Sequence, residues 1–288
     1  MKPAPFKYAS PESLEEATSL LQQHGDDAKV LAGGQSLIPL MNMRLARPGV
    51  LVDINHVAGL DGISRNGGLT IGTNTRHVTV LRSPEVRAYA PIVNEAMRHV
   101  GHVGIRTRGT FGGATAHADP AAEIPAVLLA LDAQITVQGP QGTRTIAADD
   151  FFVSTFTTEL EDDEIVTAVQ LPHPLDHAAW SFHEVSRRHG DFALVGVAAV
   201  AELDGSGNVS RARIALSGVA DTPVRVTQAE DSLVGRAPAD GADEAGRLAE
   251  QQLDPPSDFH ATSTYRREVA GALVTRALQD MDTKGGSR

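Results

Sequence analysis

Two glycine-rich segments, well separated in the chain, restrict what this sequence can fold into more than any other feature. The first is Lys29–Pro39 (KVLAGGQSLIP), and the second is Thr107–Pro125 (TRGTFGGATAHADPAAEIP). Paired glycines allow a sharp turn and a close approach to a ligand because no Cβ intervenes. The N–H groups exposed in such a turn can cradle a phosphate without a lysine. Two such loops facing each other predict a site for a pyrophosphate, and therefore for a dinucleotide.

The segments match neither of the two common nucleotide-binding motifs. The chain has no G-x-G-x-x-G between a strand and a helix, so it lacks the Rossmann fingerprint. It also has no G-x-x-x-x-G-K-[ST], which excludes a P-loop. The histidines are scattered without an H-E-x-x-H spacing, so we assign no metal ligands and no catalytic residues.

Composition is typical of a globular protein that holds no cysteine-bound redox centre. The 288 residues are 41% hydrophobic, and a formal net charge of −11 argues against nucleic-acid binding. Cysteine is absent, which excludes disulfides and iron–sulfur ligation within the chain. The sequence shows neither the apolar segment of a secretory signal nor the ~20-residue apolar run of a membrane helix. We therefore expect a cytoplasmic protein without an integral membrane segment.

Hydrophobic periodicity and turn signals predict an α+β chain. The predicted helices cover residues 10–25 (with Ser10 as the cap), 38–44, 84–100, 120–131, 223–234, 243–252 and 264–278. The predicted strands cover 30–32, 50–54, 69–72, 134–138, 144–146, 165–171, 180–186, 193–203 and 212–219. Prolines at 172 and 174 mark a domain boundary. The result is two α/β subdomains, 1–56 and 57–174, followed by an antiparallel sheet with helices, 175–288.

Taken together, the two glycine segments resemble those of a known family. The FAD-binding medium subunits of molybdenum hydroxylases, the carbon monoxide dehydrogenase and xanthine dehydrogenase family, carry A-G-G-x-S-L and then T-x-G-G-x-x-A-x-A-D-P-A-A-E. Here these motifs stand at Ala32–Leu37 and Thr110–Glu123. Further similar stretches follow the family's order: Pro5–Tyr8, Leu69–Thr73, Glu164–Val166 and Ser186–Ala193.

The resemblance implies a two-subdomain, vanillyl-alcohol-oxidase/PCMH-like FAD-binding domain that holds FAD noncovalently, followed by the C-terminal domain. It implies a flavoprotein oxidoreductase subunit. Electrons would leave molybdopterin in a large subunit, pass through [2Fe–2S] clusters in a small subunit, and reach an external acceptor through FAD. The implied assembly is a dimer of heterotrimers. The absence of cysteine from this chain agrees with iron–sulfur clusters that are held by a different subunit. Substrate and acceptor are left open.

In the first segment, the backbone N–H groups and the Ser36 hydroxyl are predicted to hold the pyrophosphate. The alternative is a plain strand-to-helix turn, which needs only one glycine. By resemblance, the residues that open the preceding strand also approach the flavin. The predicted cofactor-binding residues of this segment are Lys29, Val30, Ala32, Gly33, Gly34, Gln35, Ser36 and Leu37.

The second segment is predicted to contact the rest of the dinucleotide. Thr110, Gly112 and Gly113 are assigned to the phosphates or the ribityl chain. Ala114 stands where relatives often have Asn or Ser, so any side-chain hydrogen bond from that position is lost. By resemblance, His117 lies near the adenosine half, at a place where relatives often have a hydroxyl or a small polar residue.

Three acidic residues are also candidates for the site. Glu123 is the predicted ribityl ligand, because a carboxylate accepts hydrogen bonds from hydroxyl groups. Asp119 is either a flavin contact or the N-cap of a helix that starts at Pro120. Glu184 stands where many relatives have a lysine near the flavin, so it reverses the charge at that position.

Two further pairs complete the predicted site. Ile165 and Val166 match the apolar pair that flanks the adenine in the family, and ordinary strand core is the alternative. By resemblance, Asp191 and Phe192 lie against the isoalloxazine ring, and a solvated hairpin is the alternative. Two other functions stay open: a self-sufficient FAD-dependent oxidoreductase of the same fold, and a scaffold that has lost the cofactor.

Overall fold

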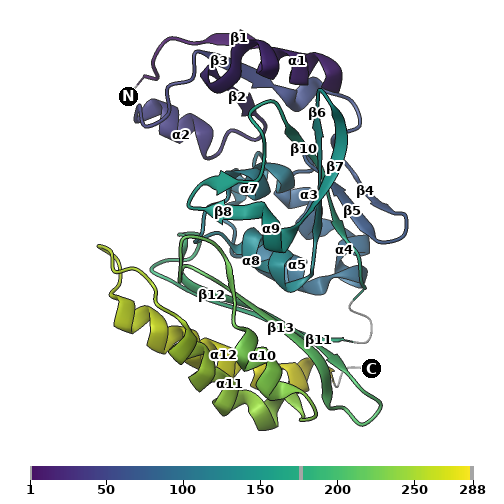
Figure 1. Ribbon diagram of the computed structural model, residues 1–288, viewed down its shortest axis with the longest axis vertical. Helices are drawn as coiled ribbons and strands as arrows, with labels where there is room; N and C mark the ends of the chain where they lie inside the picture. Colours follow the sequence, from purple (N-terminus) through teal and green to yellow (C-terminus); the bar gives the residue numbers. More distant parts are fainter. Residues whose placement is uncertain (1, 175–177, 286–288) are drawn as a thin grey trace.

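A computed structural model describes residues 2–174 and 178–285 and arranges them in three layers along the long axis of the molecule (Figure 1). A small lobe on a three-stranded sheet stands at one end, and a middle lobe on a five-stranded sheet follows. A four-stranded sheet with helices forms the other end, which confirms the predicted α+β class. None of the helices within these residues has the length and apolar character that crossing a bilayer needs.

The N-terminal lobe is a parallel sheet of order β1-β3-β2. Its elements are β1 (Lys7–Ala9), α1 (Leu14–His24), β2 (Ala28–Leu31), α2 (Leu37–Asn42) and β3 (Val50–Asp53). The Ser13 hydroxyl accepts a hydrogen bond from the Glu16 N–H and caps α1, so the cap predicted at Ser10 was wrong. Gly25, with φ of 52°, ends the helix as predicted.

The middle lobe packs short helices against an antiparallel sheet of order β4-β5-β10-β6-β7. Its strands are β4 (Ile63–Arg65), β5 (Leu69–Gly72), β6 (Gln134–Gly139), β7 (Gly142–Ala147), β8 (Phe152–Ser154), β9 (Thr157–Thr158) and β10 (Ile165–Leu171). Its helices are α3 (His77–Arg82), α4 (Pro84–Tyr89), α5 (Pro91–Met97), α6 (Val103–Arg106), α7 (Phe111–His117), α8 (Glu123–Ala130) and α9 (Ala148–Phe151). The predicted β6–β7 hairpin is confirmed, whereas β4, β8, β9, α3, α6, α7 and α9 were not predicted.

One long helix predicted in this lobe is two helices in the structure. Residues 84–100 were predicted as a single helix, but α4 ends at Tyr89 and α5 begins at Pro91. Proline has no N–H for the helical ladder and disfavours the α conformation of the residue before it. Ala90 accordingly has φ of −141° and ψ of 70°, outside the helical region.

The C-terminal sheet is antiparallel, of order β11-β12-β13-β14, as predicted for its first three strands. Its elements are β11 (Ala178–Ser186), β12 (Ala193–Leu203), β13 (Val209–Ser217), β14 (Val224–Arg225), α10 (Thr227–Leu233), α11 (Pro238–Gln252) and α12 (Ser263–Gly285). Along β12, Ala198 and Val200 belong to the core shared with the middle lobe, whereas Val197 and Ala199 pack with residues of the helices. Burial of both faces explains the unbroken apolar run of this strand.

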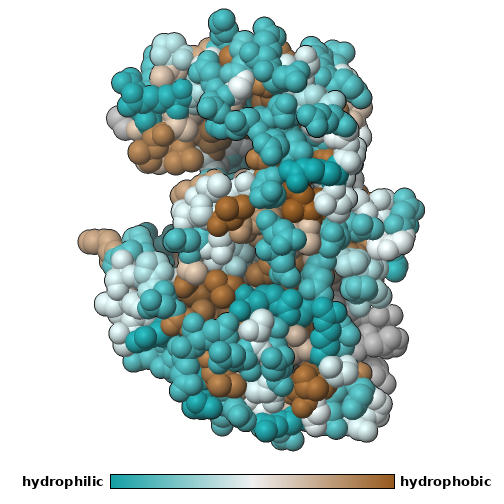
Figure 2. Space-filling view, viewed as in Figure 1, coloured by the Kyte–Doolittle hydropathy of each residue, from teal (hydrophilic) through white to brown (hydrophobic). Residues whose placement is uncertain are grey.

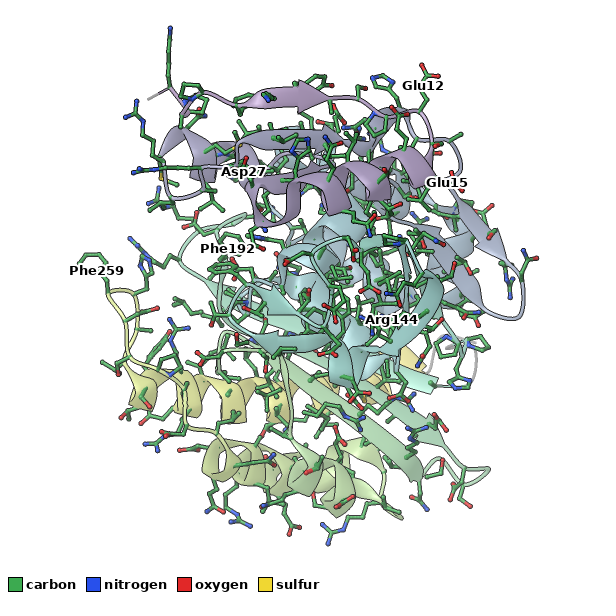
Figure 3. All side chains as sticks on the ribbon, turned by 45° about the horizontal axis from the view of Figure 1, so that its top comes forward. Glu12, Glu15, Asp27, Arg144, Phe192 and Phe259 are labelled. Carbon is green, nitrogen blue, oxygen red and sulfur yellow. The ribbon has the colours of Figure 1, made fainter. Side chains whose placement is uncertain are left out.

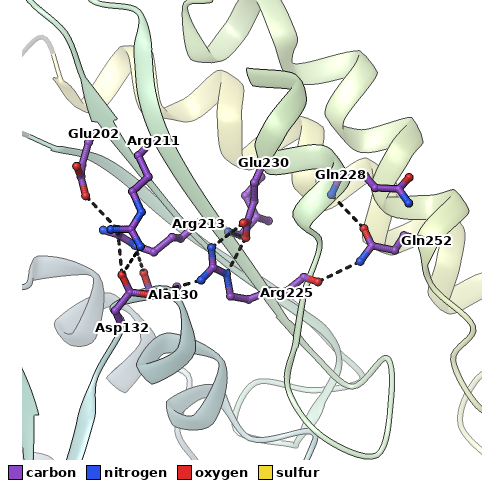
Figure 4. A network of polar contacts seen from close by, with 10 residues as sticks. Ala130, Asp132, Glu202, Arg211, Arg213, Arg225, Gln228, Glu230 and Gln252 are labelled. Atoms are coloured by element: carbon purple, nitrogen blue, oxygen red, sulfur yellow. Dashed lines mark hydrogen bonds and ion pairs between the residues drawn. The ribbon is translucent and has the colours of Figure 1, made fainter. Parts of the chain in front are cut away.

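A buried ion-pair network joins the C-terminal sheet to the middle lobe (Figure 4). The Arg213 side chain, only 2% exposed, donates through Nε to the Ala130 carbonyl at 2.9 Å. Its terminal nitrogen lies 3.2 Å from Asp132 and 3.0 Å from Glu202. Arg211 donates to the same Asp132 carboxylate at 2.9 Å. Because Ala130 and Asp132 stand at the end of α8, the network fixes that helix against β13.

Candidate functional site

A cleft of about 720 Å³ separates the N-terminal lobe from the middle lobe, a size typical of small-molecule and cofactor sites. Figure 2 shows it as a notch below the N-terminal lobe, and Figure 3 places Phe192 near it. All three layers line it, mainly through residues 28–30, 32–37, 109–110, 112–114, 116–117, 122–124, 156–158, 160–162, 164–166 and 190–192. Every predicted site residue except Asp119 and Glu184 therefore lies on its wall.

The first glycine segment joins β2 to α2 and presents unpaired backbone donors to the cleft. Among the described residues, the N–H groups of residues 33–37 have no main-chain or side-chain acceptor. Gly34 has φ of 70°, a conformation that glycine adopts without strain. Successive unpaired N–H groups in a turn form a concave anion site. This segment has the backbone geometry that a pyrophosphate requires.

The second glycine segment uses its glycines differently. It forms the first turn of α7, and its N–H groups are already paired within the protein. The Gly112 N–H donates to the Thr73 carbonyl at 3.0 Å, and the Gly113 N–H donates to the Thr110 hydroxyl at 3.1 Å. A Cβ on Gly112 would collide with the Thr73 side chain. Here the glycines allow α7 to pack closely against Thr73 and Thr110, rather than supplying a second row of free donors.

Arg76 braces the two glycine segments against each other. Its guanidinium donates to the Arg108 carbonyl at 2.5 Å and to the Asn55 amide oxygen at 2.7 Å. The Asn55 amide nitrogen in turn donates to the Ala32 carbonyl, at the start of the first segment, at 2.9 Å. Burial, followed by the neighbouring positive charge of Arg108, lowers the pKa of Arg76 from its usual value. The two segments are therefore held in register by one cation.

The backbone contact between the segments is equally close. A Cβ on Gly33 would collide with the carbonyl oxygen of Arg108 and with Gly109. The glycine pair of the first segment thus serves two purposes: Gly33 lets the second segment approach, and Gly34 supplies the turn.

Glu123 is a buried carboxyl on the cleft wall. The residue is 5% exposed, and no donor from another described residue is hydrogen-bonded to its side chain. Burial raises its pKa to about 8, with a further contribution from the negative charge of Glu184. A protonated carboxyl both donates and accepts a hydrogen bond, which suits a hydroxyl group of a ligand.

Glu184 lies behind the cleft wall rather than on it. Its side chain, on β11, is 1% exposed, and Oε1 is 3.9 Å from His99 Nδ1. Oε2 is buried without a hydrogen-bond partner, and burial raises the pKa of the carboxyl to about 7. Glu184 therefore affects the cleft through its negative charge, which raises the pKa of Glu123. The sequence did not indicate this relation.

Asp119 forms a turn ahead of α8. Its carboxylate accepts the Ala121 N–H at 2.9 Å, and α8 starts at Glu123 with Ala122 as its N-cap residue. The helix start predicted at Pro120, with Asp119 as its cap, was therefore wrong. An aspartate that bonds to the N–H two residues ahead favours such a turn over a helix.

The remaining predicted residues reach the cleft from β10 and from the β11–β12 connection. Ile165 and Val166 are 2% and 3% exposed and belong to the hydrophobic cores of the N-terminal and middle lobes. They are strand core, as the alternative had it, and they also line the cleft; their contact with adenine stays a prediction. Phe192 is 57% exposed on the wall, and Asp191 forms an ion pair with Arg188 at 3.7 Å.

Several cleft residues were missed from the sequence, and two of them carry clear structural information. His77 Nε2 lies 2.8 Å from the Thr110 carbonyl and donates to it, and burial lowers the pKa of this histidine to about 4. Phe156 lines the cleft from the β8–β9 turn. Neither stands in a recognisable motif, because each reaches the cleft through tertiary packing. The other missed wall residues include Thr73, Val100, Ile105, Thr157, Thr158 and Leu160.

Comparisons with known proteins agree with this geometry. Residues 4–174 match the family described as the FAD binding domain in molybdopterin dehydrogenase, and residues 180–281 match the CO dehydrogenase flavoprotein C-terminal domain. The chain is 42% identical to the 6-hydroxypseudooxynicotine dehydrogenase complex subunit alpha of Paenarthrobacter nicotinovorans, over 96% of this chain and 95% of that protein.

Solved structures give the same result. A chain of carbon monoxide dehydrogenase from Hydrogenophaga pseudoflava has a TM-score of 0.95 at 38% identity, over 98% of this chain and 99% of that one. A chain of quinoline 2-oxidoreductase from Pseudomonas putida 86 has a TM-score of 0.93 at 36% identity, over 99% of both. With its FAD-binding domain and its flavoprotein C-terminal domain, this chain belongs to the family of FAD-binding medium subunits of molybdenum-containing dehydrogenases.

Proposed function

We propose that this chain binds FAD noncovalently in the cleft and transfers electrons through it, from [2Fe–2S] clusters of a partner subunit to an external acceptor. The observation that carries the proposal is the row of unpaired backbone N–H groups at residues 33–37, inside the cleft of an FAD-binding domain. That row fits a pyrophosphate, the one part of FAD that needs several donors at a single point. When bound, the flavin supplies the redox chemistry.

The protein's residues bind and orient the cofactor in this proposal. Residues 33–37 and the Ser36 hydroxyl hold the pyrophosphate, and Glu123 bonds to a ribityl hydroxyl. Ile165 and Val166 supply an apolar surface for the adenine. Asp191 and Phe192 lie beside the isoalloxazine ring.

The proposed partners are a large subunit that carries molybdopterin and a small subunit that carries [2Fe–2S] clusters, assembled as a dimer of heterotrimers in the cytoplasm. Support comes from the absence of cysteine, since a cluster must then be held by another chain. The similar Paenarthrobacter protein is named as a subunit of a dehydrogenase complex. We also propose domain divisions after residues 56 and 174.

The first test is the visible spectrum of the purified chain. Absorption near ~370 and ~450 nm, and FAD in the supernatant after acid treatment, are expected for a noncovalent flavoprotein. A colourless chain that also takes up no added FAD contradicts the proposal. Co-purification with a cluster-bearing partner supports electron transfer, whereas steady turnover of an organic substrate by the isolated chain indicates a self-sufficient oxidoreductase.

A further inference from the structure

The β8–β9 turn holds an aromatic residue in a conformation that aromatic residues avoid. Phe156 has φ of 57°, in the left-handed region, as the second residue of the short turn between Ser154 and Thr157. Glycine or asparagine occupies such positions in most turns, because a Cβ and a bulky side chain are strained there. Strained residues persist where the surrounding structure imposes them, and they cluster at ligand sites.

A hydrogen bond to a second residue in the left-handed conformation holds this turn in place. The Phe156 N–H donates to the Ala118 carbonyl at 3.2 Å, and Ala118 itself has φ of 49° at the end of α7. The hydrogen bond ties the turn to the helix that carries the second glycine segment. In Figure 1, β8 lies beside α7.

The Phe156 ring gains little from the protein's own core. The residue is 57% exposed, and its ring is stacked on His117 with centroids 5.0 Å apart and an interplanar angle of 27°. Both residues line the cleft. Burial lowers the pKa of His117, so the imidazole is neutral near pH 7 and serves as a second flat ring. The strained residue therefore lies on the cleft wall, where its ring is largely exposed.

We infer that Phe156, supported by His117, is a stacking platform for one of the flat aromatic rings of the bound dinucleotide. This inference rests on the proposed binding of FAD and adds a contact residue to it. Stacking on an aromatic side chain needs only the π face of the ligand, so adenine and isoalloxazine both satisfy the chemistry.

The test compares variants of the full chain for FAD affinity and for thermal unfolding without FAD. We expect Phe156→Ala to weaken FAD binding by roughly 5- to 100-fold, the usual effect of losing one stacking contact. Phe156→Gly should lose as much affinity yet raise the unfolding temperature by about 2–4 °C, because it removes the strain along with the ring. Phe156→Trp should bind FAD like the wild type.

Phe259 provides the matched control, since it is 95% exposed and lies outside the cleft wall (Figure 3). Phe259→Ala should leave FAD affinity unchanged. Wild-type affinity in Phe156→Ala, or an equal loss in Phe259→Ala, overturns the inference while the proposed function stands. A wild-type chain that binds no FAD overturns both.

Titrations with ADP and with FMN identify the ring. A loss confined to ADP in Phe156→Ala places adenine on the platform, and a loss confined to FMN places isoalloxazine there; each result supports stacking. An equal loss for both ligands overturns it, because a single platform contacts one ring.

Discussion

At the scale of single residues, the buried carboxyl groups of Glu123 and Glu184 predict how the stability of the fold depends on pH. The pKa of Glu184 is raised to about 7, so the folded state favours its protonated form. The stability that this provides is present below the ordinary pKa of about 4.5 and is lost as the pH rises through 7. Glu184→Gln has no carboxyl to ionise at this position, so it does not lose this share of the stability, whereas the share that depends on Glu123 is lost in both proteins.

We therefore expect the FAD-free wild type and Glu184→Gln to unfold at similar temperatures at pH 5. At pH 8 the variant should be more stable by about 1–3 kcal/mol, since each unit of pKa shift corresponds to about 1.4 kcal/mol. Thermal unfolding measured at both pH values checks this. Parallel pH profiles would show that Glu184 ionises without cost.

At the scale of elements, the Arg76 brace predicts how the two glycine segments cooperate. Arg76→Gln removes charged hydrogen bonds to Asn55 and to the Arg108 carbonyl, each worth about 1.5–3 kcal/mol. We expect FAD and ADP affinity to fall by about 10- to 100-fold, because the row of N–H donors is no longer held in place. Equilibrium titration of both ligands measures the effect.

Arg98→Gln is the matched control in the same lobe. The Arg98 side chain is 64% exposed and forms an ion pair with Glu95 at 3.5 Å. Its replacement should leave both affinities unchanged. Full FAD affinity in Arg76→Gln would mean that packing of Gly33 on Arg108 aligns the segments without the cation.

Element boundaries show where local sequence was sufficient. Strands with alternating or continuous apolar patterns, such as residues 165–171 and 193–203, were predicted correctly because their burial follows from side-chain period. Helix starts were less accurate. At Pro91, the missing N–H interrupts the predicted helix although the apolar pattern continues. At Asp119, the carboxylate bonds to the N–H two residues ahead and forms a turn where the apolar pattern predicted a helix.

At the scale of the whole molecule, the network around Arg213 predicts how firmly the C-terminal sheet is attached. Arg213→Ala leaves Asp132 and Glu202 without this partner and removes the bond to the Ala130 carbonyl. Losing the charged hydrogen bond to the Ala130 carbonyl costs about 1.5–3 kcal/mol. The carboxylates add little to this loss, because Asp132 keeps Arg211 and Arg225 as partners and the Glu202 side chain is 46% exposed. Urea unfolding should show that loss.

The exposed pair Arg236–Glu244, at 2.7 Å, provides the comparison. Arg236→Ala should cost less than about 1 kcal/mol, because water solvates both partners once they separate. Equal losses in the two variants would contradict a special role for the buried network.

The sequence by itself determined the backbone of the site: the paired glycines, their spacing and the strand before the first pair. These are local properties, because glycine's freedom and a strand's side-chain period act over a few residues. The tertiary structure decided which N–H groups remain free, since Thr73 and Thr110 occupy those of the second segment. It also brought Glu184 close enough to raise the pKa of Glu123, and Phe156 onto His117. Such pairs lie far apart in the chain, and only packing brings them together.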